Sequence, residues 1–186
     1  MSGKSTIQRY PLAWRLIHWL SAAAIASLAV IGIWMAERAE ADLFDSLTDT
    51  LYAWHKGIGF CVLALAIVRV LIKVKATAPA YPASLPKKAR IAATSLHHLL
   101  YVLLFTTPLL GWASVSAYPA LGTVGGLSLP AMPGIPVNEE LAGQLFEAHE
   151  LSAFALIALV TGHIGAALVH GLKLKDGIFS RMWFGS

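Results

Sequence analysis

Four long apolar blocks constrain the fold of this chain more than any other feature of its sequence. They span about residues 14–36, 51–74, 91–117 and 141–172. A helix of about 20 apolar residues crosses the hydrocarbon core of a bilayer, so each block predicts one membrane-spanning helix. Hydrophobic residues make up 57% of the chain and charged residues only 13%, which is unusual for a water-soluble domain.

The blocks therefore predict an all-α fold, an integral membrane four-helix bundle surrounded by the lipid bilayer. We expect its helices at about residues 10–36, 50–74, 91–117 and 141–172. Because four such helices pack together into one bundle, residues 1–186 are expected to form a single domain.

Charged residues divide between the two sides of this bundle. Basic residues lie before the first helix, in the second connection and after the fourth helix, at Arg9, Lys73, Lys75, Lys87, Lys88, Arg90, Lys173, Lys175 and Arg181. The first connection is acidic, and the third has Glu139 and Glu140 but no Lys or Arg. Because Lys and Arg concentrate on the cytoplasmic side, both termini are predicted to be cytoplasmic. The net charge of +4 then reflects topology, and we expect no nucleic-acid partner.

Histidines inside the apolar blocks indicate a cofactor site. His149 and His163 lie fourteen residues apart, so their imidazoles lie on nearly one side of a helix, about 21 Å apart. By depth, His55 matches His149 near the periplasmic side, and His18 matches His163 near the cytoplasmic side. Each pair joins two helices, as bis-imidazole ligation of a metal cofactor requires. A single such histidine could be a hydrogen-bonded core residue, but two pairs matched in depth favour ligation.

The same fourteen-residue step selects two further candidates for contact with a cofactor. Gly32 follows His18 by fourteen residues and would give a flat macrocycle room at the periplasmic level. Arg69 follows His55 by fourteen residues and would reach the cytoplasmic level, where it could bind a haem propionate. The alternatives are ordinary helix packing for Gly32 and snorkelling to lipid headgroups for Arg69.

Other histidines and the single cysteine leave alternatives open. His97 lies at a depth similar to that of His18 and competes with it as a cytoplasmic ligand. His98 has no assigned role, and His170 fits either a structural role or a quinone or proton site. Cys61 is alone, and the chain has no Cys-x-x-Cys-His motif, so any haem would be held without a covalent bond.

These residues, in this order, resemble the bacterial cytochrome b561 family, which is related to the b-type subunits of nickel-hydrogenases and formate dehydrogenases. The matching segments are Ile17-His18-Trp19, Trp54-His55-Lys56-Gly57, His97-His98-Leu99-Leu100-Tyr101, Pro108, Gly111-Trp112, His149-Glu150, His163, His170 and Lys175-Asp176-Gly177. The resemblance implies two haems b in a protein of the bacterial inner membrane. It also implies iron ligation by the two histidine pairs, and electron transfer from a periplasmic donor to quinone, with ubiquinone as the expected acceptor.

Some members of the family are superoxide oxidases, so the resemblance leaves the donor as superoxide or a periplasmic redox protein. Lys56, beside His55, is the candidate for attracting the superoxide anion, although the periplasmic loops are mostly acidic. The alternative is a non-enzymatic anchor whose haems connect a partner dehydrogenase to quinone. A histidine-lined metal transporter is disfavoured by the aliphatic mid-helix segments. The sequence is compatible with a homodimer.

Overall fold

A computed structural model describes residues 8–75, 79–82 and 85–184 of the chain. Its long helices are α1 (Leu12–Glu40), α2 (Ser46–Lys75), α3 (Lys87–Ala117) and α4 (Glu139–Leu168). All four are long and apolar enough to cross a membrane, which confirms the predicted all-α, four-helix membrane fold. The described residues form no β-strand; one isolated bridge joins Gly122 to Ser128.

The helices extend past the apolar blocks where polar residues continue them. For example, α1 ends at Glu40 and not near residue 36, and α3 begins at Lys87 and not near residue 91. Pro11 precedes α1 and Pro86 precedes α3, positions where the missing N–H of proline removes no helical hydrogen bond. Helix α4 continues into η2 (Val169–Leu174), a π-helical turn that ends at Lys175 with φ of 50°.

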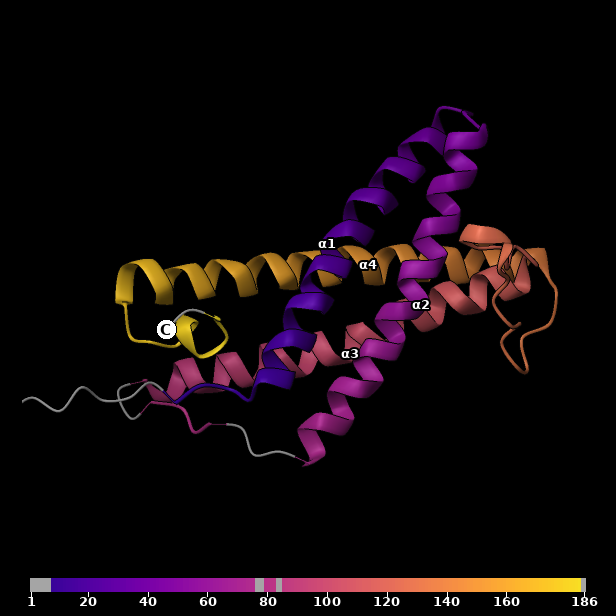
Figure 1. Ribbon diagram of the computed structural model, residues 1–186. Helices are drawn as coiled ribbons and strands as arrows, with labels where there is room; N and C mark the ends of the chain where they lie inside the picture. The colour runs from indigo at the N-terminus through magenta and orange to yellow at the C-terminus, as the bar shows by residue number, and fades with distance from the viewer. Residues whose placement is uncertain (1–7, 76–78, 83–84, 185–186) are drawn as a thin grey trace, which may run out of the picture.

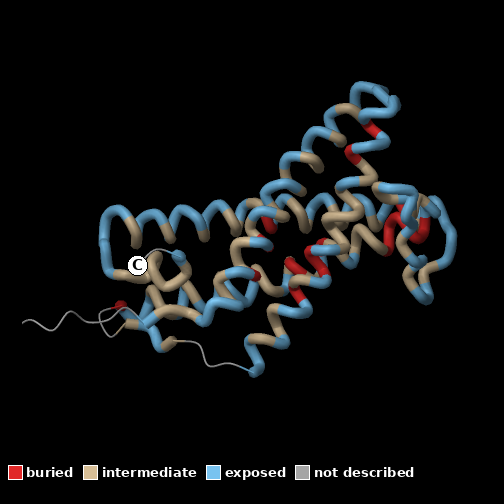
Figure 2. The backbone as a smooth tube through the Cα atoms, in the orientation of Figure 1, coloured by how far each residue is buried: buried red, intermediate tan, exposed pale blue. Residues whose placement is uncertain are grey.

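The four helices form two antiparallel pairs that cross each other. Figure 1 shows the α1–α2 pair lying diagonally across the α3–α4 pair. A small core at the contact between the pairs consists of Val62, Ala66 and Leu104, packed against Ala24, Ile25, Leu28 and Phe105. Few other residues are buried, and large apolar side chains such as Leu151, 74% exposed, face outwards (Figure 2). Such an apolar exterior suits a bundle whose solvent is lipid.

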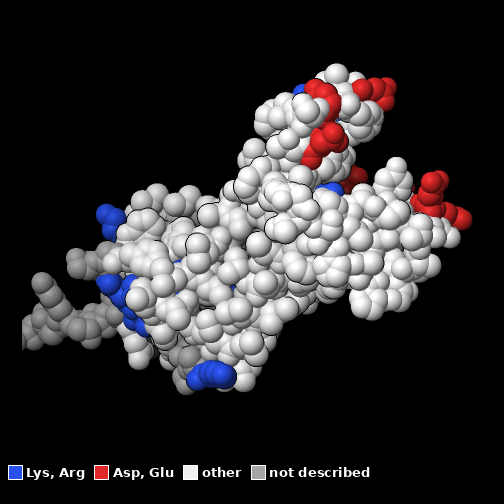
Figure 3. Space-filling model, turned by 45° about the vertical axis from the view of Figure 1, so that its right-hand side comes forward, with Lys and Arg blue, Asp and Glu red and all other residues white. Residues whose placement is uncertain are grey.

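Charge separates the two ends of the bundle. In Figure 3, Lys and Arg gather at one end and Asp and Glu at the other, with an uncharged band between them. The acidic end carries the α1–α2 turn, where the Asp45 carboxylate accepts hydrogen bonds from the N–H groups of Leu47 and Thr48 and so caps α2. Arg38 forms a 2.6 Å ion pair with Asp45. The Thr48 N–H, followed by Arg38, holds the pKa of Asp45 below its usual value.

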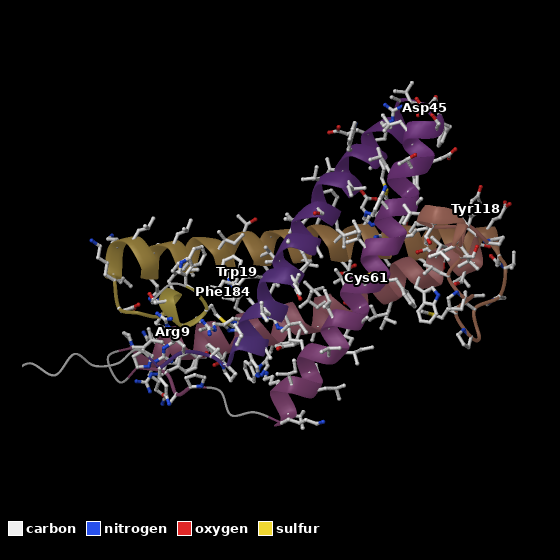
Figure 4. The ribbon with its side chains drawn as sticks, in the orientation of Figure 1. Arg9, Trp19, Asp45, Cys61, Tyr118 and Phe184 are labelled. Carbon is white, nitrogen blue, oxygen red and sulfur yellow. The ribbon has the colours of Figure 1, made fainter. Side chains whose placement is uncertain are left out.

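At the basic end, the residues after α4 fold back onto α1. After Lys175 a short 3-10 turn, η3 (Phe179–Arg181), brings the chain alongside the start of α1. Trp19 Nε1 donates a 2.9 Å hydrogen bond to the Met182 carbonyl, and Arg15 donates a 3.0 Å bond to the Trp183 carbonyl. Figure 4 labels Trp19 and Phe184 at this end. The last described residues therefore tie the start of α1 to the segment that follows α4.

Candidate functional site

Towards the acidic end, His55 of α2 faces His149 of α4. The centres of their rings are 6.0 Å apart, and the ring planes are nearly perpendicular, at 88°. Both rings are only partly exposed. The structure thus brings together the first of the two pairs that depth matching predicts, from two different helices.

A glycine lies against each ring of this pair. A Cβ added to Gly32 of α1 would lie 3.1 Å from Cε1 of His55, and one added to Gly111 of α3 would lie 3.0 Å from both Nδ1 and Cε1 of His149. Real Cβ contacts are rarely this short, so a larger residue would displace the rings. All four helices therefore shape this site. Gly32 lies where the fourteen-residue step places it, whereas the sequence interpretation names Gly111 only as part of a family segment and does not predict its approach to His149.

A hydrogen bond determines which nitrogen of the neutral His149 ring carries the proton. Its Nδ1 lies 2.9 Å from the carbonyl oxygen of Thr107, and because a carbonyl only accepts, Nδ1 must donate. In the neutral ring, Nε2 is then free to bind a metal, the arrangement typical of ligating histidines. The Nδ1 atom of His55 is buried without a hydrogen-bond partner among the described residues.

Towards the basic end, His18 of α1 and His163 of α4 form the second pair. Their ring centres are 6.1 Å apart, with 67° between the planes. A third ring, His97 of α3, lies 5.4 Å from His163. His97 donates from Nδ1 to the Ala93 carbonyl at 2.6 Å, so its Nε2 is also free to bind. In the structure His97 therefore lies close enough to His163 to compete with His18 as a ligand, the alternative that the sequence identified.

Arg69 of α2 reaches this second pair. Its Nη2 lies 2.9 Å from Nδ1 of His18, and because a guanidinium only donates, His18 Nδ1 must accept. A neutral imidazole that binds a metal through Nε2 carries its proton on Nδ1, which would then face the Arg69 donor. The two arrangements exclude each other. Metal ligation by His18 therefore requires Arg69 to move to another partner.

Ring spacing tests whether each pair fits one metal between its rings. A metal–imidazole bond is about 2.0 Å long and a ring nitrogen lies about 1.1 Å from its ring centre, so two trans imidazoles have centres about 6.2 Å apart. The two predicted pairs match this distance, and the 5.4 Å between His97 and His163 is shorter. Two imidazoles suit a macrocycle that supplies its own in-plane donors. Among the described residues, no three His, Cys, Asp or Glu side chains are grouped to hold a bare metal ion.

Other candidate residues have local partners. Lys56 donates a 2.7 Å hydrogen bond from Nζ to the Ala120 carbonyl and so ties α2 to the α3–α4 connection. His170 pairs with Asp176 at 2.6 Å beside the turn that ends η2. His98 lies at the surface of α3. None of these contacts adds a ring or charge to the two histidine pairs.

Comparison with known proteins gives the family. A family model described as prokaryotic cytochrome b561 matches residues 9–185. The chain belongs to this family. Among its relatives, "Cytochrome b561 homolog 2" of Escherichia coli is 29% identical over 184 residues, 98% of this chain and 95% of the relative. "Probable superoxide oxidase CybB" of Yersinia pestis is 28% identical over 167 residues, 89% of this chain and 90% of the relative.

Membership of the cytochrome b561 family, together with four membrane-spanning helices, defines the general activity. The chain is a multi-pass protein of the bacterial inner membrane that carries b-type haem and takes part in electron transfer. The paired imidazoles, the glycines beside them and the free Nε2 of His149 fit a haem as the group between the rings.

Proposed function

We propose that this cytochrome b561 protein binds two haems b, one between His55 and His149 and one between His18 and His163. The observation that supports this most strongly is the near-equal spacing of the two ring pairs, 6.0 and 6.1 Å, each bridging two helices. Because α4 contributes His149 and His163 fourteen residues apart, the two sites are stacked about 21 Å apart along one helix.

The charge distribution supports an orientation for this stack. Lys and Arg gather at the end that holds both described chain ends, which by the positive-inside rule is cytoplasmic (Figure 3). The His55–His149 pair is then the periplasmic pair, and the His18–His163 pair is the cytoplasmic pair. Electrons enter from a periplasmic donor and leave to the membrane quinone pool, with ubiquinone as acceptor.

The protein supplies the histidine ligands, the room beside them and a positive charge near one of the two proposed haems. When bound, each haem supplies reversible one-electron exchange at its iron, and two histidine ligands leave that iron no open position for oxygen. Gly32 and Gly111 leave room beside the periplasmic rings. With haem bound between His18 and His163, Arg69 would leave His18 Nδ1 and would bind a haem propionate, since a carboxylate supplies the two acceptor oxygens that a guanidinium prefers.

Superoxide is one candidate donor, because a relative is named a probable superoxide oxidase. A periplasmic redox protein is the other, because the acidic end offers little free positive charge. Arg38 is paired with Asp45, and Lys56 is bonded to the Ala120 carbonyl. With a protein donor, the chain acts as the membrane anchor of a partner dehydrogenase.

Two measurements test the proposal. The pyridine haemochrome assay on purified protein should give two haems b per chain, and His149→Ala should retain one; one haem or none in the unaltered protein contradicts the two-haem assignment. Stopped-flow mixing with superoxide then distinguishes the donors. Rapid haem reduction, followed by reoxidation when decylubiquinone is added, identifies a superoxide oxidase, whereas no reduction favours the protein donor.

A further inference from the structure

The segment that follows η2, residues 176–184, is attached to the helical turn that it leaves. We call this segment the C-terminal strap. Its first residue, Asp176, accepts a 2.6 Å hydrogen bond from Nδ1 of His170. A Cβ added to Gly171 would lie 3.2 Å from Cγ of Phe179, so the strap also packs directly against the backbone of η2. These contacts fix where the strap begins.

Further along, the strap holds the side chain of Trp19 on α1 by two contacts (Figure 4). The Nε1–H of Trp19 donates a 2.9 Å hydrogen bond to the Met182 carbonyl. The Trp19 ring also meets the Trp183 ring edge-on, with centres 5.4 Å apart and 83° between the planes. Trp183 is itself stacked on Phe179 at 5.5 Å. The strap therefore fixes both the direction and the tilt of the Trp19 indole.

Trp19 in turn contacts the candidate ligand His18. The two rings are nearly perpendicular, at 85°, and their centres are 5.4 Å apart. The His18 ring also contacts Arg69 and His163. In the proposed haem-bound state Arg69 moves to a propionate, so it no longer restrains the imidazole. The Trp19 indole is then the neighbouring ring that restricts how the His18 ring turns.

A second tryptophan of α1 lacks this connection. Trp14 lies five residues before Trp19 and stacks on Tyr10, with ring centres 5.3 Å apart. Its Nε1 is buried without a hydrogen-bond partner among the described residues. The two tryptophans share a helix and a ring, but of the two it is Trp19 that is bonded to the strap. Trp14 is therefore a natural control for the indole N–H of Trp19.

We propose that the C-terminal strap is a positioning element for His18 and acts through Trp19. The inference rests on the proposed function, because it assumes that His18 and His163 bind one haem iron. The orientation of an axial imidazole plane changes the d orbitals of a low-spin iron and so its g values. Because the indole fixes that plane, the strap determines the magnetic signature and the retention of one haem. The other haem, about 21 Å away along α4, is outside its reach.

Matched variants of the haem-loaded protein test the hydrogen bond to the strap. Trp19→Phe removes the bonded N–H, and Trp14→Phe removes an N–H that has no partner. In the EPR spectrum of the oxidised protein, Trp19→Phe should shift one of two low-spin signals, and Trp14→Phe should shift neither. Trp19→Phe should also speed loss of that haem to apomyoglobin about two- to tenfold, the factor that corresponds to one hydrogen bond.

Backgrounds that retain one haem show which haem responds. In His149→Ala the retained haem lies between His18 and His163, and adding Trp19→Phe should shift its EPR signal. In His163→Ala the retained haem lies at the other pair, and adding Trp19→Phe should leave its signal unchanged. A shift in the His163→Ala background overturns the proposal, because the variant then acts through the whole fold.

A double variant tests the strap itself. Trp183→Leu removes the ring that meets Trp19 but leaves the Met182 carbonyl in the chain. If both residues act on the same ring, the EPR shift in Trp19→Phe/Trp183→Leu should be smaller than the sum of the single shifts. Additive shifts, or no shift in Trp183→Leu, overturn the role of the strap.

The unaltered protein separates this inference from the proposed function. Two low-spin signals in the unaltered protein, with equal spectra for Trp19→Phe and Trp14→Phe, overturn the positioning role alone. Unaltered protein that holds no haem between His18 and His163 overturns the proposed function and the positioning role together.

Discussion

The two histidine pairs share a ring spacing but differ in their surroundings. The His55–His149 pair, proposed to be periplasmic, already has the form of a binding site, because Gly32 and Gly111 leave room beside the rings and Thr107 fixes the proton of His149 on Nδ1. The His18–His163 pair, proposed to be cytoplasmic, has a guanidinium bonded to His18 and a third imidazole, His97, beside His163. Two ring pairs with nearly the same spacing can thus differ in the room, the hydrogen bonds and the neighbouring charges that surround them.

This difference has an electrostatic consequence for the proposed electron path. A fixed positive charge stabilises the reduced form of a nearby iron, because reduction lowers the positive charge of the metal. Arg69 contacts His18, whereas among the described residues His149 Nδ1 pairs with the Thr107 carbonyl and His55 Nδ1 has no hydrogen-bond partner. In the proposed two-haem arrangement, Arg69 would offset the negative charge of the propionate that it binds, so the potential of the haem between His18 and His163 would be higher than it would be without this cation.

The largest expected effect is a loss of haem, which distinguishes His18 from His97 as the partner of His163. His18→Ala should reduce the haem content from two per chain to one, because the ring at the fitting distance is lost. His97→Ala should retain both haems, since its 5.4 Å spacing to His163 is short for a shared iron. The pyridine haemochrome assay measures this difference. Retention of both haems in His18→Ala with loss of one in His97→Ala would reassign the ligand to His97.

A smaller effect tests the room beside the periplasmic rings. Gly111→Ala should weaken haem binding there by about 1–3 kcal/mol, because its Cβ would lie 3.0 Å from His149. Gly162→Ala is the matched control, since a Cβ at that helical glycine meets nothing within 4 Å. Haem loss on dilution, followed at the Soret band, should speed up only in Gly111→Ala. Equal rates in the two variants would contradict the close approach.

Removing the cation should lower one potential and leave the other. In Arg69→Met the midpoint potential of the cytoplasmic haem should fall by roughly 30–60 mV, which corresponds to about 1 kcal/mol for one electron. The periplasmic haem, about 21 Å away along α4, is the internal control. A redox titration followed optically measures both. Equal shifts in the two potentials would show that the variant acts through the fold and not through local charge.

The smallest expected effect lies at the acidic end, where Asp45 caps α2. Because its pKa is lowered in the folded protein, the carboxylate stabilises the fold above its unfolded pKa of about 3.9, and this contribution is lost as the pH falls through the lowered value. Asp45→Asn should therefore lower the melting temperature slightly at neutral pH, and its difference from the unaltered protein should shrink below about pH 4. Asp42→Asn is the control, since Asn tolerates its positive φ of 54°.

The sequence predicts those features that depend on one helix at a time. Apolar length predicts four helices, and the fixed helical rise predicts both histidine pairs and the place of Gly32, because depth along a helix follows from residue number. Features that depend on how helices rotate and cross were not predictable in this way. Gly111 meets His149 from another helix, and the bond from Arg69 to His18 depends on how α2 packs against α1.

The Lys56 hypothesis illustrates the same limit. The sequence singles out this residue for its charge beside His55, but its ammonium is bonded to a carbonyl in the α3–α4 connection, more than sixty residues away in the chain. The fold-back of the C-terminal segment is similar, since it depends on backbone carbonyls at Met182 and Trp183 that carry no sequence signal.

That fold-back has a consequence for biogenesis. His18 belongs to the first long helix to be synthesised and His163 to the last, and the carbonyls of Met182 and Trp183, translated later still, accept hydrogen bonds from α1. His149 of the periplasmic pair is also on α4. Neither pair can therefore form before its histidine of α4 has been synthesised. If these pairs hold haem as proposed, a nascent chain that stalls before α4 has no complete haem site.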